Sequence, residues 1–298
     1  MTKRRRLGRR TREALLGYAL VLPSLVLFGT FVFYPFVKNI WLGLYRSPPS
    51  PLLPRRWVGL DQYQDVLTSD AFINSVEVTF LFALYTVPLG LVLGLGLAVL
   101  AHQRLRGVAI YRTIFSSTVA TSVAVASVIF FTLLNPRIGM IPYWFGTDTN
   151  PLQDPQWALI SVSATTIWQN LGLSFILMSA GLQSVPDDLL EAARVDGAGA
   201  WSRFRNVVLP LLSPTLFFAA VVGTILAFQA FGQIDILTRG GPGDRTNVLV
   251  YSIYRSVFVS SPPDQGRAAV LSVALFTITL VLTLIQLRFL ERRVTYER

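Results

Sequence analysis

Residues Glu191–Pro210 read EAARVDGAGAWSRFRNVVLP, a polar segment between two long apolar ones. Its first half is rich in helix formers and ends at Gly197-Ala198-Gly199, where glycine favours a reversal of the chain. Its second half repeats large side chains with the spacing of one helical face; these are Trp201, Phe204, Arg205 and Val208. The segment therefore predicts two short helices joined by a turn, the second ended or kinked at Pro210.

The residues just before this segment predict where its first helix begins. Ser184 precedes Asp187 by three positions, as in a capping box, and Pro186 suits a first helical turn. The helix should run to about Val195. Such a pair of helices can lie at a membrane surface without a partner. The small side chains of the first helix equally suit a groove of another protein, and the pattern alone leaves both readings open.

The composition places the chain in a membrane. Its 298 residues are 52% hydrophobic and 14% charged, whereas soluble domains average about 25% charged residues. Cysteine is absent and His102 is the single histidine, so we predict no disulfide and no metal site. The net charge of +10 sits in loops beside apolar segments. Positive charge in such loops sets the orientation of the chain in the membrane. We therefore predict no binding of nucleic acid.

Six apolar segments are long enough to cross the hydrocarbon core of a bilayer, which takes about 20 residues. They are 15–37, 73–101, 109–134, 157–182, 214–237 and 268–290. We therefore predict an all-α membrane protein with six transmembrane helices in one domain, 15–290. A basic N-terminus, 1–14, and a short C-terminus, 291–298, flank this domain.

The arginines and lysines of the loops predict which side each loop faces. Seventeen lie in the two termini and in the loops after the second and fourth segments, against nine in the remaining loops. Since cytoplasmic loops carry the excess of positive charge, both termini and the loop 184–210 are predicted in the cytoplasm. The first apolar segment is too long for a signal peptide and reads as an uncleaved anchor.

The loops predicted outside are longer and rich in glycine and proline. Residues 38–72 should be extended, with a short helix near 60–67, and 135–156 and 238–267 should be irregular. They are either docking surfaces for an external partner or plain connectors.

The polar segment resembles the cytoplasmic signature loop of the permease subunits of ABC importers. The resemblance rests on Glu191-Ala192-Ala193, on Asp196-Gly197 after it, and on the closing Leu209-Pro210. It extends over nearly the whole chain to the sugar and glycerol-phosphate branch of that family. The stretches that carry it are GLDQY at 59–63, LNP at 134–136, GGP at 240–242, VYSIYR at 250–255 and IQLRFLERRVTY at 285–296. The last resembles the first permease subunit of glycerol-3-phosphate importers.

This resemblance implies a type I importer permease (MetI-like) with both termini inside and a cytoplasmic coupling helix. It implies the bacterial inner membrane, a second permease subunit in a heterodimer, two ATPase subunits and an external substrate-binding protein. The cargo would be glycerol-3-phosphate or its diesters, with a neutral mono- or disaccharide as the alternative. ATP and Mg²⁺ would be bound by the ATPase subunits, and this chain would bind no cofactor.

The positions of the two lysines indicate that this chain does not itself bind ATP through a phosphate-binding loop. A phosphate-binding loop needs a lysine after a GxxxxG frame, and neither Lys3 nor Lys38 follows one. Without a cysteine, or a histidine beside a serine, a catalytic nucleophile is not indicated either. We therefore expect a non-catalytic transport subunit that depends on a separate ATPase.

Polar residues inside apolar segments are the candidates for a solute pathway, because lipid tolerates them poorly. They are Glu77, Trp168, Gln169, Asn170, Gln229, Gln233 and Asp235. An aromatic ring beside amides suits a polyol or sugar, and Gln229 and Gln233 should share one helical face. Each could instead bond two helices, and Glu77 and Asp235 could be interfacial. A proton-coupled carrier using Glu77 or Asp235 would leave the signature loop unexplained.

Overall fold

The protein is described by a computed structural model over residues 9–48, 50, 53–103, 106–145 and 150–290. Within these ranges the regular secondary structure is helical, except for one antiparallel hairpin of β1 (Tyr45–Arg46) with β2 (Arg56–Trp57). This confirms the all-α membrane fold. The C-terminal region 291–298 and the first eight residues of the basic N-terminus lie outside the described residues.

Four continuous helical stretches are long and apolar enough to cross a membrane. Two bent pairs of helices, Val108–Ala120 with Val123–Leu133 and Ala200–Leu211 with Ser213–Phe228, bring the number to six if each pair counts as one span. The continuous ones are Leu16–Leu42, within α1 (Arg9–Phe28), η1 (Gly29–Phe33) and α2 (Tyr34–Leu42), then α4 (Asp70–His102), α8 (Ala158–Gln183) and α15 (Gln265–Leu290). The described part of the chain therefore agrees with the six predicted spans in number.

The predicted third and fifth spans are not single straight helices, which corrects the sequence expectation. The third divides at Thr121–Ser122 into α5 (Val108–Ser117) with η2 (Thr118–Ala120), and α6 (Val123–Leu133), bent by 105°. Ser122 accepts a hydrogen bond from the Val125 amide and so caps the new helix. The fifth ends early, as α12 (Ser213–Phe228), and restarts as α13 (Gly232–Leu237).

Two of the π-helical segments directly precede a residue pair that ends in proline. η1 ends one residue before Tyr34-Pro35, and η3 (Phe204–Val208) ends one residue before Leu209-Pro210. A proline offers no N–H, and its ring crowds the carbonyl four residues earlier, so the helix widens there rather than breaking. These residues therefore stay helical while the direction of the helix changes.

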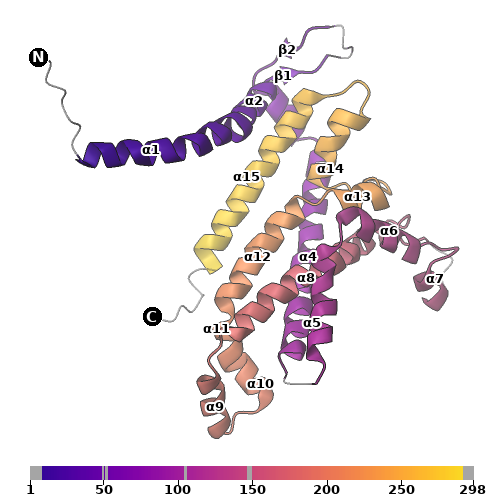
Figure 1. Ribbon diagram of the computed structural model, residues 1–298. Helices are drawn as coiled ribbons and strands as arrows, with labels where there is room; N and C mark the ends of the chain where they lie inside the picture. The colour runs from indigo at the N-terminus through magenta and orange to yellow at the C-terminus, as the bar shows by residue number, and fades with distance from the viewer. Residues whose placement is uncertain (1–8, 49, 51–52, 104–105, 146–149, 291–298) are drawn as a thin grey trace, which may run out of the picture.

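The helical body is built around the pair α4 and α8, with α12 packed on both (Figure 1). A Cβ at Gly94 would lie 2.6 Å from Ser174 Cβ, so only glycine permits this approach of α4 to α8. The nearby Gly90 has no neighbour within 4 Å and serves no such contact. Of these two glycines of α4, Gly94 alone makes a close contact.

The two ends of the body differ, and we name them by what they carry. The loop end holds α9 (Asp187–Val195), α10 (Ala200–Arg203), η3 and α11 (Leu209–Leu211); the hairpin end holds β1, β2 and the start of α15 (Figure 1). The short helix α3 (Asp61–Leu67) confirms the one expected near 60–67. Burial raises the pKa of Tyr63, whose hydroxyl donates to Ile40 O and ties α3 to α2.

The segment 238–267 is more ordered than the irregular connector that was expected. It contains α14 (Leu249–Tyr254) and η4 (Arg255–Val259), and its residues Thr246, Val248 and Leu249 are buried. The Leu249 amide donates to Thr79 Oγ1 of α4 across 170 positions of sequence. The segment therefore packs into the body, while α7 (Met140–Phe145) interrupts the other expected loop.

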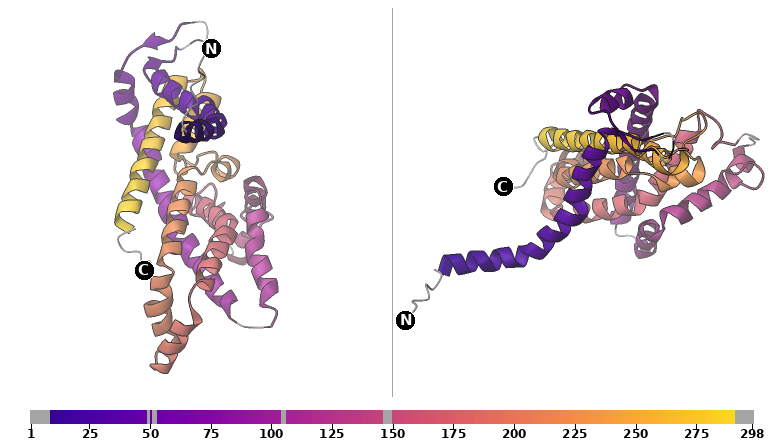
Figure 2. Two further views of the ribbon diagram at one scale, coloured as in Figure 1. Left: turned by 60° about the vertical axis from the view of Figure 1, so that its left-hand side comes forward. Right: turned by 90° about the horizontal axis from the view of Figure 1, so that it is seen from above.

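The N-terminal helix α1 lies apart from the body. Figure 2 shows it projecting sideways, and the membrane-length stretch 16–42 has none of its most apolar window buried. Its apolar side chains therefore have lipid or another protein as their surroundings. Because α1 does not run beside the other spans, the cytoplasmic position of the N-terminus stays a prediction.

Candidate functional site

The loop 184–210 forms two helices and a turn, as expected from its sequence. The helix α9 ends in a Schellman motif, because the Ala198 amide donates to Ala193 O at 2.9 Å and the Gly197 amide to Arg194 O at 3.1 Å. Gly197 has φ +78°, a conformation that costs other residues strain. Gly199 has φ −64° and precedes α10 as its cap residue, so Gly197 alone makes the reversal.

The start of α9 differs from the predicted capping box. Pro186 is the cap residue and provides no side-chain bond, while Ser184 ends α8 and its hydroxyl donates to Gly181 O at 2.7 Å. A Cβ at Gly181 would lie 2.5 Å from Leu212 Cδ1 and 2.7 Å from Thr215 Oγ1. The two helices that carry the loop are thus in close contact at its base.

The loop presents apolar side chains to its surroundings. Leu189 is 43% exposed, Val195 87% and Trp201 70%. Asp188 and Glu191 are exposed on the same helix as the first two. An exposed apolar surface with a large aromatic side chain is typical of a contact site for another protein.

The second half of the loop is held in a defined orientation. The Arg203 guanidinium donates to Ala198 O at 2.8 Å, and the rings of Trp201 and Phe204 stack at 5.6 Å. α9 packs on η3, and the helix 200–211 meets α12 at an angle of 66°. The π turn shifts the expected face, so Arg205 points to solvent while Phe204 and Val208 are half-buried.

Three neighbouring residues of α8 have three different surroundings. The Trp168 ring lies 5.6 Å from that of Phe130 on α6. Gln169 donates through Nε2 to Thr121 O at 3.5 Å and accepts at Oε1 from Gln233 Nε2 at 3.1 Å. Asn170 lines a cavity. A polar cluster in the sequence is thus divided among three contacts.

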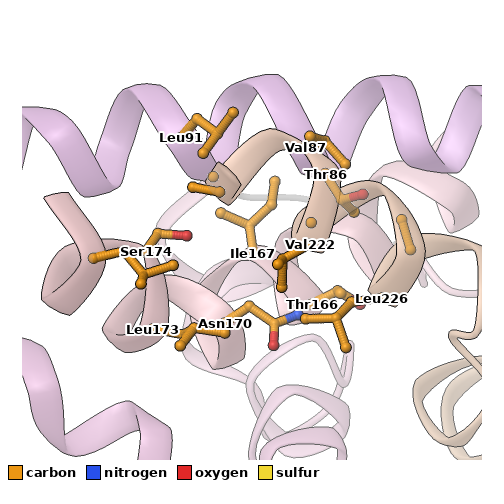
Figure 3. Close-up of a pocket in the computed structure, with 15 residues that line it drawn as sticks. Thr86, Val87, Leu91, Thr166, Ile167, Asn170, Leu173, Ser174, Val222 and Leu226 are labelled. Atoms are coloured by element: carbon orange, nitrogen blue, oxygen red, sulfur yellow. The ribbon is translucent and has the colours of Figure 1, made fainter. Parts of the chain in front are cut away.

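This cavity lies between α4, α8 and α12 and has a volume of about 50 Å³ (Figure 3). Its polar side chains are those of Thr86, Thr166, Asn170 and Ser174. The Asn170 amide has no hydrogen-bond partner among the residues that the structure describes. A space of this size holds a few waters and not a solute such as a polyol phosphate.

Thr166 and Ser174 were not singled out from the sequence, although a signal was present. Thr166, Asn170 and Ser174 follow one another at intervals of four, so they share one face of α8. A polar face in an apolar helix identifies the side that meets other helices or a cavity.

The remaining pathway candidates are not brought to this cavity. Gln229 ends α12 and is exposed, and Gln233 is 4% exposed on α13, so the shared helical face expected for them is wrong because the helix breaks between them. Glu77 is exposed on α4, and Asp235 is half-buried on α13. Their roles in a pathway stay predictions. No three of the described histidines, aspartates and glutamates are placed to bind a metal.

A larger cavity of about 560 Å³ opens at the hairpin end. It lies between the segment 47–48, the segment 244–264 with α14 and η4, and the start of α15. Arg255 and Arg267 line it, with Asp244 and Asp264. Arg255 pairs with Asp244, and Asp264 accepts from the Arg267 amide and caps α15. The Arg267 guanidinium makes no ion pair with an acidic side chain within the described residues, and the lining as a whole carries two arginines and two aspartates.

The family described as the binding-protein-dependent transport system inner membrane component matches residues 87–296 of this chain. The match includes the loop 184–210, both broken spans and the segment 238–267.

Proteins of known name are similar over almost the whole length. The sn-glycerol-3-phosphate transport system permease protein UgpA of Agrobacterium fabrum is 37% identical over 286 residues, which cover 95% of this chain and 97% of that protein. The protein of the same name from Escherichia coli O157:H7 is 35% identical, with 96% and 97% covered.

Solved structures show the same fold. A bacterial alginate ABC transporter, in complex with a pentasaccharide-bound periplasmic protein, includes a chain that superposes with a TM-score of 0.83 at 21% identity. That superposition covers 98% of this chain and all of the other. A chain of the MetNI methionine ABC transporter, in inward facing conformations, gives 0.55 at 18% identity over 78% of this chain and 98% of that one.

Proposed function

Because this chain belongs to the inner membrane components of binding-protein-dependent transport systems, we propose that it is the permease subunit through which such a system imports glycerol-3-phosphate or its diesters. As a member of this family it is a non-catalytic, multi-pass protein of the bacterial inner membrane. A partner ATPase hydrolyses the ATP, and an external binding protein delivers the solute.

The loop 184–210 is the element that receives the movement of the ATPase. Its exposed Leu189, Val195 and Trp201 form the apolar centre of a docking surface, and Asp188 and Glu191 supply charge beside it. Gly197 reverses the chain so that both helices of the loop can meet the partner. The positive-inside distribution of arginine supports the cytoplasmic side for this loop.

A second permease subunit completes the pathway. The cavity among α4, α8 and α12 has only about 50 Å³, whereas a bound small molecule needs several hundred. The helices α1 and α2 also leave an apolar surface uncovered. A heterodimer with a second subunit of the same kind would enclose a pathway and cover part of this surface, with two ATPase subunits on the loop end.

The glycerol-phosphate cargo is supported by the relatives at 35–37% identity and by the external cavity that Arg267 lines. A phosphate is recognised by a cation that is not already neutralised. The inner cavity of this chain alone is too small for the solute, but its neutral hydroxyl and amide groups would suit the glycerol part in a pathway that a second subunit completes. A neutral sugar is the second candidate, since these same groups would bind one.

The cargo is tested with the complete transporter in proteoliposomes, supplied with ATP inside and its binding protein outside. We expect uptake of radiolabelled glycerol-3-phosphate that an excess of a glycerophosphodiester suppresses and an excess of a disaccharide does not. ATP-dependent uptake of the disaccharide in preference to the phosphate ester would contradict this assignment and favour the neutral cargo.

A further inference from the structure

The two broken spans break at the same place in the molecule. α6 begins at Val123 after the first break, and α13 begins at Gly232 after the second. A Cβ at Gly232 would lie 2.6 Å from Val123 Cγ1, so the first residues of the two outer half-helices touch. Along their length α6 and α13 pack on each other. They form one unit on the hairpin side of both breaks (Figure 1).

The unbroken helix α8 passes this junction, and one of its side chains bonds both breaks. Gln169 Nε2 donates to Thr121 O at 3.5 Å. Thr121 has an extended backbone and ends the first half of the third span. Gln169 accepts from Gln233, in the first turn of α13, at 3.1 Å. A helix break removes carbonyl groups from the regular ladder, and inside a membrane such groups need another donor.

Close packing also fixes α8 to the inner half of the third span. The Gly172 amide donates to Thr118 Oγ1 at 2.8 Å, and a Cβ at Gly172 would lie 2.6 Å from that oxygen. Any side chain here would push η2 away from α8. The helix α8 thus holds the inner half of the third span by packing at Gly172, and the amide of Gln169 holds the break at Thr121 and the outer half-helix α13.

The same helix leads directly into the loop 184–210. Gln183 follows Gln169 by fourteen positions of continuous α-helix, a length of about 21 Å at 1.5 Å per residue. On the other side of the loop, α12 ends at the second break. Gly181 and Leu212 keep the starts of both paths in contact. A displacement of the loop is therefore carried by two helices to one junction.

We propose that Gln169 is a positioning residue that ties the break of the third span and the helix α13 to α8, so that movement of the loop reaches α13 and, through its packing on α13, α6 as well. The bond then links ATP hydrolysis at the loop end to opening at the hairpin end. This inference rests on the proposed coupling role of the loop and is independent of which solute is carried.

The test uses Gln169→Met, Gln233→Met and the double variant in the complete transporter, reconstituted with its binding protein. The measured quantity is the number of ATP molecules hydrolysed per solute imported. A residue with only a structural role lowers hydrolysis and uptake in proportion and leaves this ratio unchanged. We expect each single variant to raise the ratio by about threefold to tenfold. This fold-change corresponds to the free energy of one interhelical hydrogen bond in a membrane and is of the size found for coupling between distant sites.

The matched control is Gln286→Met. Gln286 Nε2 donates to Thr224 Oγ1 at 2.8 Å and joins α15 to α12 by a bond that involves neither α8 nor the outer half-helices α6 and α13, so its loss should leave the ratio at the wild-type value. The double variant should raise the ratio no further than Gln169→Met alone, because that change already removes the bond to Gln233 as well as the one to Thr121 O. If Gln169→Met fails to assemble, Gln233→Met removes the bond from the other helix.

A wild-type ratio in Gln169→Met and Gln233→Met, or effects of the two that add, would overturn the inference. Failure of the coupling role itself is distinguished by loop variants. If a variant at Glu191 and Gly197 leaves hydrolysis and uptake normal, the coupling proposal fails. If that variant is uncoupled while the glutamine variants are not, only the role of Gln169 fails.

Discussion

Gly197 determines the shape of the loop at the level of a single residue. With φ +78° and open space around it, a Cβ would meet no neighbour, so the cost of a side chain there is conformational. We expect Gly197→Ala to strain the turn by about 1–2 kcal/mol and to lower the yield of ATPase subunits that co-purify with the permease.

The matched control for this change is Gly199→Ala, two residues further on. Gly199 also has no neighbour within 4 Å, but its φ of −64° suits any residue. Equal co-purification of the ATPase with Gly197→Ala and Gly199→Ala would show that the turn does not depend on a left-handed residue.

Arg267 tests the phosphate part of the cargo. Replacing its unpaired guanidinium in the external cavity by Gln should raise the apparent KM for glycerol-3-phosphate about threefold to tenfold, as expected for a lost charged hydrogen bond. The effect should shrink at higher salt, because this site is open to solvent. Arg56→Gln removes an exposed arginine of the same end and serves as the control. A KM for Arg267→Gln equal to that of the control would exclude this arginine from recognition.

The polar residues of α8 show what sequence can and cannot decide at this scale. The rarity of such residues in apolar helices singled out Trp168, Gln169 and Asn170 as pathway candidates, and the structure gives them three different surroundings: a ring contact, two hydrogen bonds and a cavity. Which neighbour each one meets depends on how α8 is rotated and on where other helices break. That information lies in tertiary packing and not in the local sequence.

At the scale of elements, the contact of α8 with α12 is the base of the loop. We expect Gly181→Ala to overpack against Leu212 and Thr215 and to lower the stability of the complex by about 1–3 kcal/mol. Thermal unfolding of the purified complex measures this. Gly96→Ala, on α4 with no neighbour within 4 Å, is the control and should not destabilise. Equal stability of both variants would contradict the close contact.

The lengths of the spans were predictable, whereas their breaks were not. Apolar length set α4, α8 and α15 to within a few residues, because crossing a bilayer requires it. Hydropathy gives little weight to two polar residues in an apolar run, so the break at Thr121–Ser122 was missed, although a serine at that point is a good helix cap. The order of the segment 238–267 arises from contacts with α4 that are far apart in sequence.

At the scale of the molecule, loop charge predicts that the loop end faces the cytoplasm and the hairpin end faces outward. The chain has no cysteine, so single cysteines can report sidedness without background. Arg56→Cys at the hairpin end should react with a membrane-impermeant maleimide in intact cells, and Arg106→Cys, in the loop between α4 and α5, only in inside-out vesicles. Both residues are exposed. Labelling of Arg106→Cys in intact cells would contradict the orientation that loop charge predicts.

The whole chain also shows why a permease subunit is recognised more readily than its cargo. The loop 184–210 is a continuous segment whose two helices and turn follow from local sequence, although its N-terminal cap and its buried face do not. The solute meets residues from several helices, and the inner cavity of this chain is too small to enclose it. The cargo therefore depends on surfaces that two subunits form together.

The central claim is that energy enters this chain through the loop 184–210. The most direct measurement is the ATPase activity of the complete transporter, with and without ligand-loaded binding protein, in a variant that combines Glu191→Ala with Gly197→Ala. We predict that stimulation by the binding protein and solute uptake are lost while the permease subunits remain assembled in the membrane. Wild-type stimulation and uptake, with the ATPase still co-purifying, would contradict the account.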